Sequence, residues 1–262
     1  MNRALRTAAT GMLAQQMNVD LISNNLANVN TTGYKKARAE FQDLMYQTIK
    51  ASGASQDGQT KEATEIQIGN GTIPAAVVKS FGQGDITPTN NPLDLAVQGE
   101  GFLQIRRPDG TVAYTRDGAL KISGEGQLVT SQGYIIEPGI SFSSDTTSIS
   151  IGKDGTIEVM AVGQTVPVKV GQFELAKFVN PGGLRAIGGN LYIETEASGK
   201  PILGVGGNEG FGEVVQGSLE SSNVDVVEEM ISMIVAQRAY EINSKTIRTV
   251  EDMLTMANNL KR

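Results

Sequence analysis

The chain has 262 residues and a formal net charge of −6, which is enough length for one large domain or two modest ones. The acidic balance argues against a general nucleic-acid binder, because such proteins usually carry a basic surface. The absence of cysteine and histidine excludes disulfides, thiol chemistry and the two commonest transition-metal ligands. We therefore expect no metal and no cofactor. We expect no membrane insertion, since no apolar run approaches the roughly 18 residues of a membrane span.

An amphipathic helix is predicted at the N-terminal end, where Gly11 is the one helix breaker among the first 32 residues. Apolar side chains recur there at the seven-residue spacing of a coiled-coil seam, namely Leu5, Met12, Val19, Ile22, Leu26 and Val29. Asparagines follow at Asn24, Asn25, Asn28 and Asn30, before a turn at Gly33 for which we expect the left-handed conformation. The basic residues of this end, Arg3, Arg6, Lys35, Lys36 and Arg38, are interpreted as a solvated face.

The middle of the chain is predicted to be rich in β-structure. A polar segment over 46–71 comes first and is long for an ordinary loop, so it is either disordered or ordered by contact with another molecule. Beyond it, turn signals such as Asp109-Gly110 and Asp154-Gly155 separate short β-prone runs, including GFLQIR, TVAYT, TIEVM and LYIET. This spacing predicts a meandering antiparallel sandwich or barrel, because no helical crossover separates the runs.

A second amphipathic helix is predicted at the C-terminal end, where residues 218–262 contain neither glycine nor proline. Its seam also follows a seven-residue spacing, at Val226, Met233, Tyr240, Ile247 and Leu254. Ser221, Ser222 and Asn223 offer helix N-caps. Each end helix is marginal alone in water, so we expect the two to pair and to give an α+β fold.

Groups that could form a catalytic site are missing from the sequence. The aspartates that precede glycine are ordinary hairpin residues, so an enzyme is the first alternative and a weak one. If the apolar faces of the two helices are wider than one partner can cover, the rest must be buried between subunits, and a head-to-tail contact of that kind builds rings or open filaments. A monomeric binding module with a β-domain is the other alternative.

The ends and several central motifs resemble those of the bacterial flagellar rod and hook axial proteins. The likeness is carried by MNRALRTAATGMLAQQMNVDLISNNLANVNTTGYKK, by NNPLDLAVQGEGFLQI, YTRDGAL and GQLVTSQGY, and by SLESSNVDVVEEMISMIVAQRAYEINSKTIRTVEDML. It covers essentially the whole chain in the same order. The pattern is most similar to the distal-rod members, and a hook or proximal-rod subunit is the alternative within the family.

This resemblance implies a structural subunit with a discontinuous architecture. It predicts an inner, coiled-coil-like α-helical domain from residues 1–35 and 218–262, an extended linker over 36–74, and a β-rich antiparallel outer domain over 75–217. Such subunits polymerise with themselves into a hollow, rigid rod that crosses the periplasm, transmits torque from motor to hook and passes exported subunits. The other implied partners are proximal-rod and hook axial proteins, the envelope bushing rings, and the flagellar type III apparatus, which exports without a cleaved signal peptide.

Three groups of residues receive expected roles from this comparison. Phe41 and Met45 fit an export-gate motif, although core packing of Phe41 explains the pattern equally well. The segment from Tyr46 and Gln47 to Gly71 is expected to order between protofilaments and to stiffen the rod.

The asparagines before Gly33 form the third group. Buried amides there are expected to fix register between subunits, with candidate counterparts at Gln237, Asn243 and Ser244. A frayed, polar helix end is the alternative interpretation of the same residues.

Overall fold

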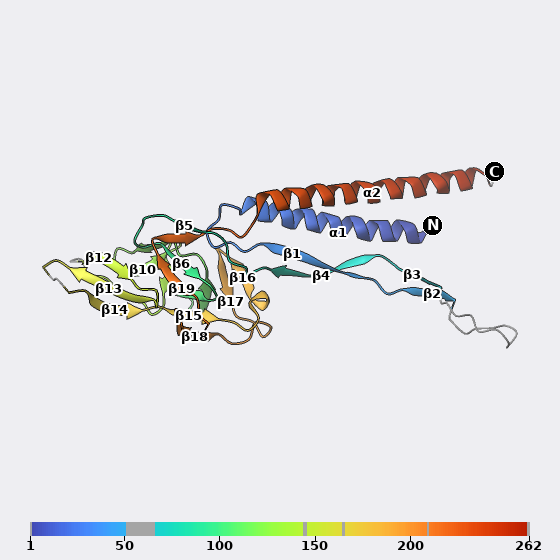
Figure 1. Ribbon diagram of the computed structural model, residues 1–262. Helices are drawn as coiled ribbons and strands as arrows, with labels where there is room; N and C mark the ends of the chain where they lie inside the picture. Colours follow the sequence, from blue (N-terminus) through green and yellow to red (C-terminus); the bar gives the residue numbers. More distant parts are fainter. Residues whose placement is uncertain (1, 51–65, 144–145, 164–165, 209, 261–262) are drawn as a thin grey trace. The chain divides into compact units, whose positions relative to one another are not determined.

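The computed structural model describes residues 2–50, 66–143, 146–163, 166–208 and 210–260 (Figure 1). It contains two compact units. The helical unit comprises Met1–Leu26, Ala37–Val78 and Val226–Arg262, and the β-rich unit comprises Ala27–Lys36 and Lys79–Asp225. Two end helices with a central antiparallel β-region give the α+β class, which confirms the predicted fold class. The predicted domain limits stay predictions.

The two helices pack together in the helical unit. They are α1 (Asn2–Ala27) and α2 (Val226–Asn259). Asn25, near the end of α1, is hydrogen-bonded to Glu229 near the start of α2. Gly11, earlier in α1, lies against Asn243, later in α2. The helices are therefore antiparallel neighbours, as Figure 1 shows. This confirms that the two chain ends pair.

The helical unit also contains two-stranded ladders among its described residues. The strands are β1 (Ala37–Asp43), β2 (Gln47–Lys50), β3 (Ile66–Ile68) and β4 (Thr72–Lys79). β1 pairs with β4, and β2 pairs antiparallel with β3, with Gln47 opposite Ile68. The Thr72 amide donates to the Thr10 hydroxyl on α1 at 3.4 Å. Paired strands thus occupy part of the segment predicted as an extended linker. Residues 51–65 of the predicted stiffening segment lie outside the described residues.

The β-rich unit is built from short strands joined by turns. They are β5 (Ile86–Pro88), β6 (Leu95–Gln98), β7 (Phe102–Arg106), β8 (Val112–Thr115), β9 (Leu120–Ile122), β10 (Leu128–Thr130), β11 (Ile135–Ile136), β12 (Thr146–Ile151), β13 (Thr156–Ala161), β14 (Val168–Gln172), β15 (Glu174–Lys177), β16 (Arg185–Gly188), β17 (Leu191–Ile193), β18 (Ile202–Val205), β19 (Glu213–Gln216) and β20 (Ser218–Glu220), with a 3-10 turn at Pro181–Gly183. The predicted runs coincide with β7, β8, β13 and β17.

The strands of the β-rich unit form several antiparallel sheets. The largest has the order β16-β17-β8-β7-β11-β10-β9, with β15 pairing β7 and β18. Smaller sheets join β12, β13 and β14, β6 with β19, and β5 with β20. The last two ladders tie the end of the β-region, just before α2, to its beginning.

Two clusters of buried side chains form the core of the β-rich unit. The larger is mainly aliphatic, and it includes Leu103, Ile105, Ile157 and Leu175. The smaller is aromatic, and its rings meet edge to face: Tyr114 with Phe178 at 4.8 Å, and Phe81 with Tyr192 at 5.2 Å and with Phe102 at 5.4 Å. Among the described residues, neither helix combines the length and apolar character that a membrane span requires.

Candidate functional site

The α1–α2 seam of the helical unit is narrow. The buried side chains on it are Ala8, Ala14, Ile22 and Asn25 on α1, and Glu229, Ala236 and Val250 on α2. Three of these seven are alanines, and a Cβ added to Gly11 would lie only 2.9 Å from the Asn243 amide nitrogen. The helices therefore approach closely along one line, and large apolar side chains on either side of that line are left partly in solvent.

Asn25 fixes the register of this seam within the chain. Its side-chain nitrogen donates to the Ala37 carbonyl at 2.9 Å and to the Glu229 carboxylate at 3.2 Å. Its side-chain oxygen accepts the Ala37 amide at 3.0 Å. The side chain is 2% exposed, so one amide ties α1, α2 and β1 together. Within the chain its partner on α2 is Glu229, and Asn243 faces Gly11. Counterparts between subunits at Gln237, Asn243 and Ser244 stay a prediction.

The other predicted register residues occupy the surface and the turn after α1. Asn24 and Asn30 are exposed, and Asn28 accepts a hydrogen bond from the Thr31 hydroxyl at 3.1 Å. Gly33 has φ +67°, the left-handed conformation expected for it, and a Cβ there would lie 2.7 Å from the Arg116 carbonyl carbon. A role of these asparagines between subunits stays a prediction.

The predicted seam residues fall into three environments. Ile22 is buried; Val226 and Tyr240 are exposed; and the half-buried ones are Leu5, Met12, Val19, Leu26, Val29, Met233, Ile247 and Leu254. Val29 does not lie on the helix, contrary to the expectation that the helical seam extends to it. α1 ends at Ala27, and the chain then turns, with the Thr31 amide donating to the Asn28 carbonyl. A role of these residues in contacts between subunits stays a prediction.

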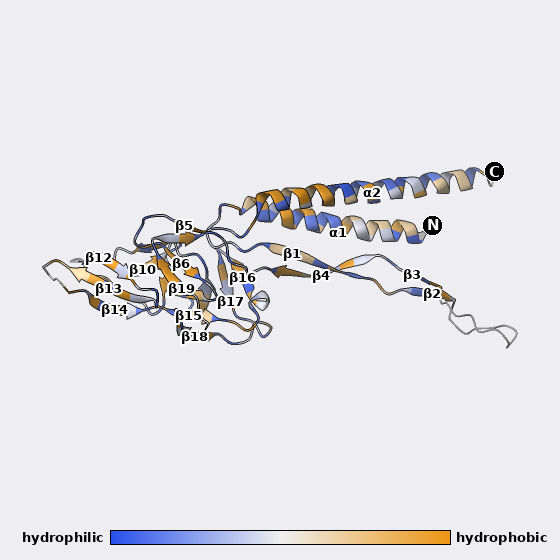
Figure 2. Ribbon diagram, in the orientation of Figure 1, coloured by the Kyte–Doolittle hydropathy of each residue, from blue (hydrophilic) through white to orange (hydrophobic). Residues whose placement is uncertain are grey.

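An exposed apolar stripe runs along the first half of α2. Its members are Val227, Ile231, Ile234, Val235 and Ile242, which are between 55% and 66% exposed. Their spacing of four, seven, eight and fifteen residues from Val227 places them on one helix face. Figure 2 shows this part of α2 coloured as hydrophobic. We call this set the α2 stripe.

The strands of the helical unit expose apolar side chains as well. Ile49, Ile66 and Ile68 on β2 and β3 are between 40% and 56% exposed. Phe41 is 39% exposed and Met45 86%, so Phe41 is not a core residue, and the alternative explanation of the Phe41–Met45 pattern by core packing is wrong. Two-stranded ladders are marginal alone in water. Tyr46 and Gln47 are also exposed at the start of β2.

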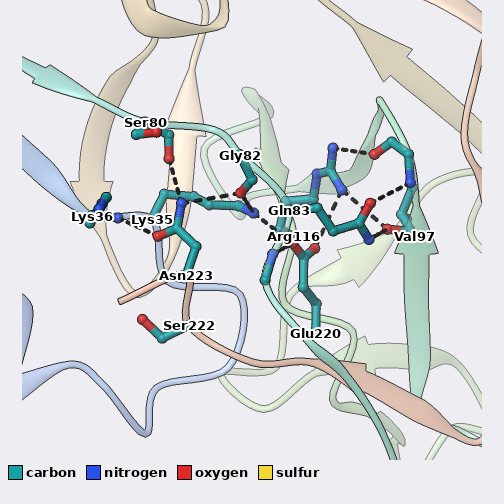
Figure 3. Close-up of polar contacts among 12 residues, drawn as sticks. Lys35, Lys36, Ser80, Gly82, Gln83, Val97, Arg116, Glu220, Ser222 and Asn223 are labelled. Carbon is teal, nitrogen blue, oxygen red and sulfur yellow. Dashed lines mark hydrogen bonds and ion pairs between the residues drawn. The ribbon is translucent and has the colours of Figure 1, made fainter. Parts of the chain in front are cut away.

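A buried ion cluster lies within the β-rich unit (Figure 3). The Lys35 ammonium donates to Glu220 Oε1 at 2.6 Å and to the Gly82 carbonyl at 2.7 Å. Arg116 donates to Glu220 Oε2 at 3.3 Å and to the Gly99 carbonyl at 2.7 Å. The three charged side chains are at most 4% exposed. We call these three residues the ion cluster.

The electrostatics of the ion cluster follow from its burial. Two cations share one carboxylate, and the carbonyls of Gly82, Val97 and Gly99 accept further hydrogen bonds from them, while the buried Arg116 Nε has no hydrogen-bond partner among the described residues. Burial lowers the pKa of Lys35 against the opposing effect of its bond to Glu220, and the charge of Arg116 lowers it further. Burial likewise lowers the pKa of Arg116. Sequence reasoning missed this cluster: Lys35 was interpreted as part of a solvated face, and it is fully buried.

The residues before α2 also differ from expectation. α2 begins at Val226, so Asn223 is too far away to act as its N-cap. Its side chain instead accepts the Lys36 amide at 2.8 Å and donates to the Ser80 carbonyl at 2.9 Å. A polar run before a helix signals a cap, and nothing in the sequence alone distinguishes a cap from a long-range contact.

The described residues contain no group of three or more carboxylates that could hold a metal ion. The hairpin aspartates Asp109 and Asp154 accept hydrogen bonds from the hydroxyls of Thr111 and Thr156, two residues ahead, as turn residues do. The features that can carry a function are thus the helix seam, the exposed apolar side chains around it, and the ion cluster.

Comparison with known proteins agrees with this reading of the chain. The flagella basal body rod protein family matches residues 5–35, the flagellar hook protein FlgE/F/G D1 domain matches 96–159, and the flagellar basal body rod FlgEFG protein C-terminal family matches 215–260. Flagellar basal-body rod protein FlgG of Borreliella burgdorferi is 53% identical over 100% of both chains. The chain belongs to the flagellar basal-body rod protein family. It is a structural rod subunit of the distal-rod type, as predicted.

Two further relatives define the position within the family. Flagellar basal-body rod protein FlgG of Caulobacter vibrioides is 49% identical over 99% of both chains. Flagellar hook-basal body complex protein FlhP of Bacillus subtilis is 32% identical over 100% of both chains. The family is structural, which confirms that the chain is not an enzyme.

Proposed function

We propose that the chain polymerises head to tail with copies of itself into a hollow, rigid distal rod that transmits torque from motor to hook and passes exported subunits. The α2 stripe is the observation that carries this proposal. Apolar side chains more than half exposed on one face of a helix mark an interaction surface rather than a solvated one. The occupant is a second copy, because the family membership makes this a rod subunit and the seam leaves that face of α2 open.

The strands of the helical unit support the same proposal. An exposed ladder with isoleucines on it gains stability only when another surface covers it. We infer that the segment from Tyr46 and Gln47 to Gly71 orders between neighbouring protofilaments and stiffens the polymer. The seam residues and Asn24, Asn28 and Asn30 remain candidates for contacts between subunits.

The wider partners follow from the same family. The rod would join proximal-rod axial proteins at one end and hook axial proteins at the other, inside the bushing rings of the envelope. It would span the periplasm of the basal body. The subunits would leave the cell through the flagellar type III apparatus without a cleaved signal peptide. Exposed Phe41 and Met45 are accessible for recognition at the export gate.

A paired substitution in the α2 stripe tests the central proposal. Ile231→Glu with Ile234→Glu places two charges where a second copy would bury apolar surface, and Thr249→Glu is the control on the same exposed helix. We expect the stripe variant to keep its helical circular dichroism but to form no rods. Cells that carry this variant should be non-motile, and electron microscopy of their basal bodies should show that the distal rod is missing. The control should assemble. Normal rods built from the stripe variant would contradict the proposal.

A further inference from the structure

The chain passes between its two units at four points, after residues 26, 36, 78 and 225. Any force carried along the chain from one unit to the other runs through these connections. Three of them lie beside residues that are bonded to one another inside the β-rich unit. The bonded residues are Lys36, Ser80 and Asn223. Each lies at, or within two residues of, a point where the chain passes between the units.

These three residues form a closed ring of hydrogen bonds. The Lys36 amide donates to the Asn223 side-chain oxygen at 2.8 Å, and the Asn223 side-chain nitrogen donates to the Ser80 carbonyl at 2.9 Å. The Ser80 amide closes the ring by donating to the Lys36 carbonyl at 2.8 Å. Figure 3 shows the Asn223 side chain joined by dashed lines to Lys36 and to Ser80. A single amide therefore joins three segments far apart in sequence.

The ion cluster is linked to this ring through one backbone carbonyl. The Gly82 carbonyl accepts both the Lys35 ammonium at 2.7 Å and the Asn223 side-chain nitrogen at 3.1 Å, so ring and cluster share one acceptor. Glu220 also accepts the Gly84 amide at 3.0 Å. The segments before residue 37, after residue 78 and before residue 226 are thus held on buried charges that cannot move without losing their partners.

We propose that Asn223 is a positioning residue that staples three chain exits of the β-rich unit into one rigid patch, and that this patch gives the rod part of its bending stiffness. The inference rests on the proposed rod function. Its physical basis is that a three-way amide bridge resists separation of any pair of segments. Two separate hydrogen bonds would leave the third segment free to pivot.

Asn223→Asp tests the staple by replacing the side-chain amide group with a carboxylate oxygen, which also adds a negative charge, as the control does. Aspartate keeps the oxygen that accepts the Lys36 amide but cannot donate to the Ser80 and Gly82 carbonyls. Asn180→Asp is the matched control, because the Asn180 side chain donates to the Ala197 carbonyl at 3.0 Å elsewhere in the same unit.

Hydrogen exchange on the full chain is the first measurement. We expect the Ser80 amide, which keeps its own acceptor, to lose protection by about five- to tenfold in Asn223→Asp, the change that loss of one hydrogen bond produces. Protection of the Ser80 amide should be unchanged in Asn180→Asp, which loses one exposed hydrogen bond outside the ring. Unchanged protection at Ser80 would overturn the staple, because it would mean that the Ser80–Lys36 backbone hydrogen bond is stable without the Asn223 side chain.

The spread of bending angles along rods in isolated basal bodies is the second measurement. Asn223→Asp should widen it relative to wild type and to Asn180→Asp. Equal spreads in the two variants would overturn the mechanical role of the staple. If the wild-type chain built no rods, the proposed function would fail instead, while the exchange measurement would still decide whether Asn223 holds the exits together.

Discussion

Replacing Glu220 by glutamine should strongly destabilise the β-rich unit. Glutamine keeps the shape of the side chain but leaves Lys35 and Arg116 buried without a counter-charge. Breaking a buried pair in this way costs about 3–5 kcal/mol. The two charge-assisted bonds to Glu220, at 2.6 and 3.3 Å, give roughly the same sum at about 1.5–3 kcal/mol each. At roughly 2–4 °C per kcal/mol, the melting temperature should fall by about 6–20 °C.

Differential scanning calorimetry is the appropriate assay, because the two units need not melt together and calorimetry resolves separate transitions. Glu137→Gln is the matched control: it makes the same chemical change in an exposed pair with Arg106, whose side chains are 22% and 61% exposed. The control should cost at most about 1 kcal/mol. If Glu220→Gln melted as Glu137→Gln does, the ion cluster would not hold the unit together, and the reasoning from burial would be refuted.

Three further outcomes are expected. Asn25→Leu should cost the helical unit about 3 kcal/mol, since three hydrogen bonds at roughly 1 kcal/mol each are lost; unchanged helix melting would count against it. Deleting residues 47–66 should give bendable rods, and straight, stiff rods would contradict the stiffening role. Burial raises the pKa of Tyr114 to about 12, so wild type should lose roughly 1.4 kcal/mol per pH unit relative to Tyr114→Phe above pH ~10, where the unfolded tyrosine ionises first. Parallel urea titrations of the two proteins at pH 9 and 11 measure the difference.

Local patterns in the sequence predicted much of the fold. Seven-residue spacing around Met12 and Met233 predicted two helices, and turn residues such as Asp109 and Asp154 marked the ends of real strands. These patterns suffice because helix and strand periodicity depend on neighbours close in the chain. The ladders of β1 to β4 were not predicted. Both faces of these strands are largely exposed, so their sequences lack the alternation of apolar and polar residues that marks a half-buried strand.

The ion cluster and the Asn223 ring could not be predicted in the same way. Lys35 and Glu220 are 185 positions apart, and nothing beside either residue shows that it is buried rather than solvated. The same limit applied to the bond between Asn25 and Glu229, which lie 204 positions apart. Charged side chains are usually exposed, so only the tertiary structure identifies the exceptions.

The Asn25–Glu229, Lys35–Glu220 and Lys36–Asn223 contacts all join the beginning of the polypeptide to its end. A chain that emerges from a ribosome or a narrow conduit with its N-terminus first cannot make any of them until the final segment is free. These three contacts can therefore form only after the C-terminal segment has been released.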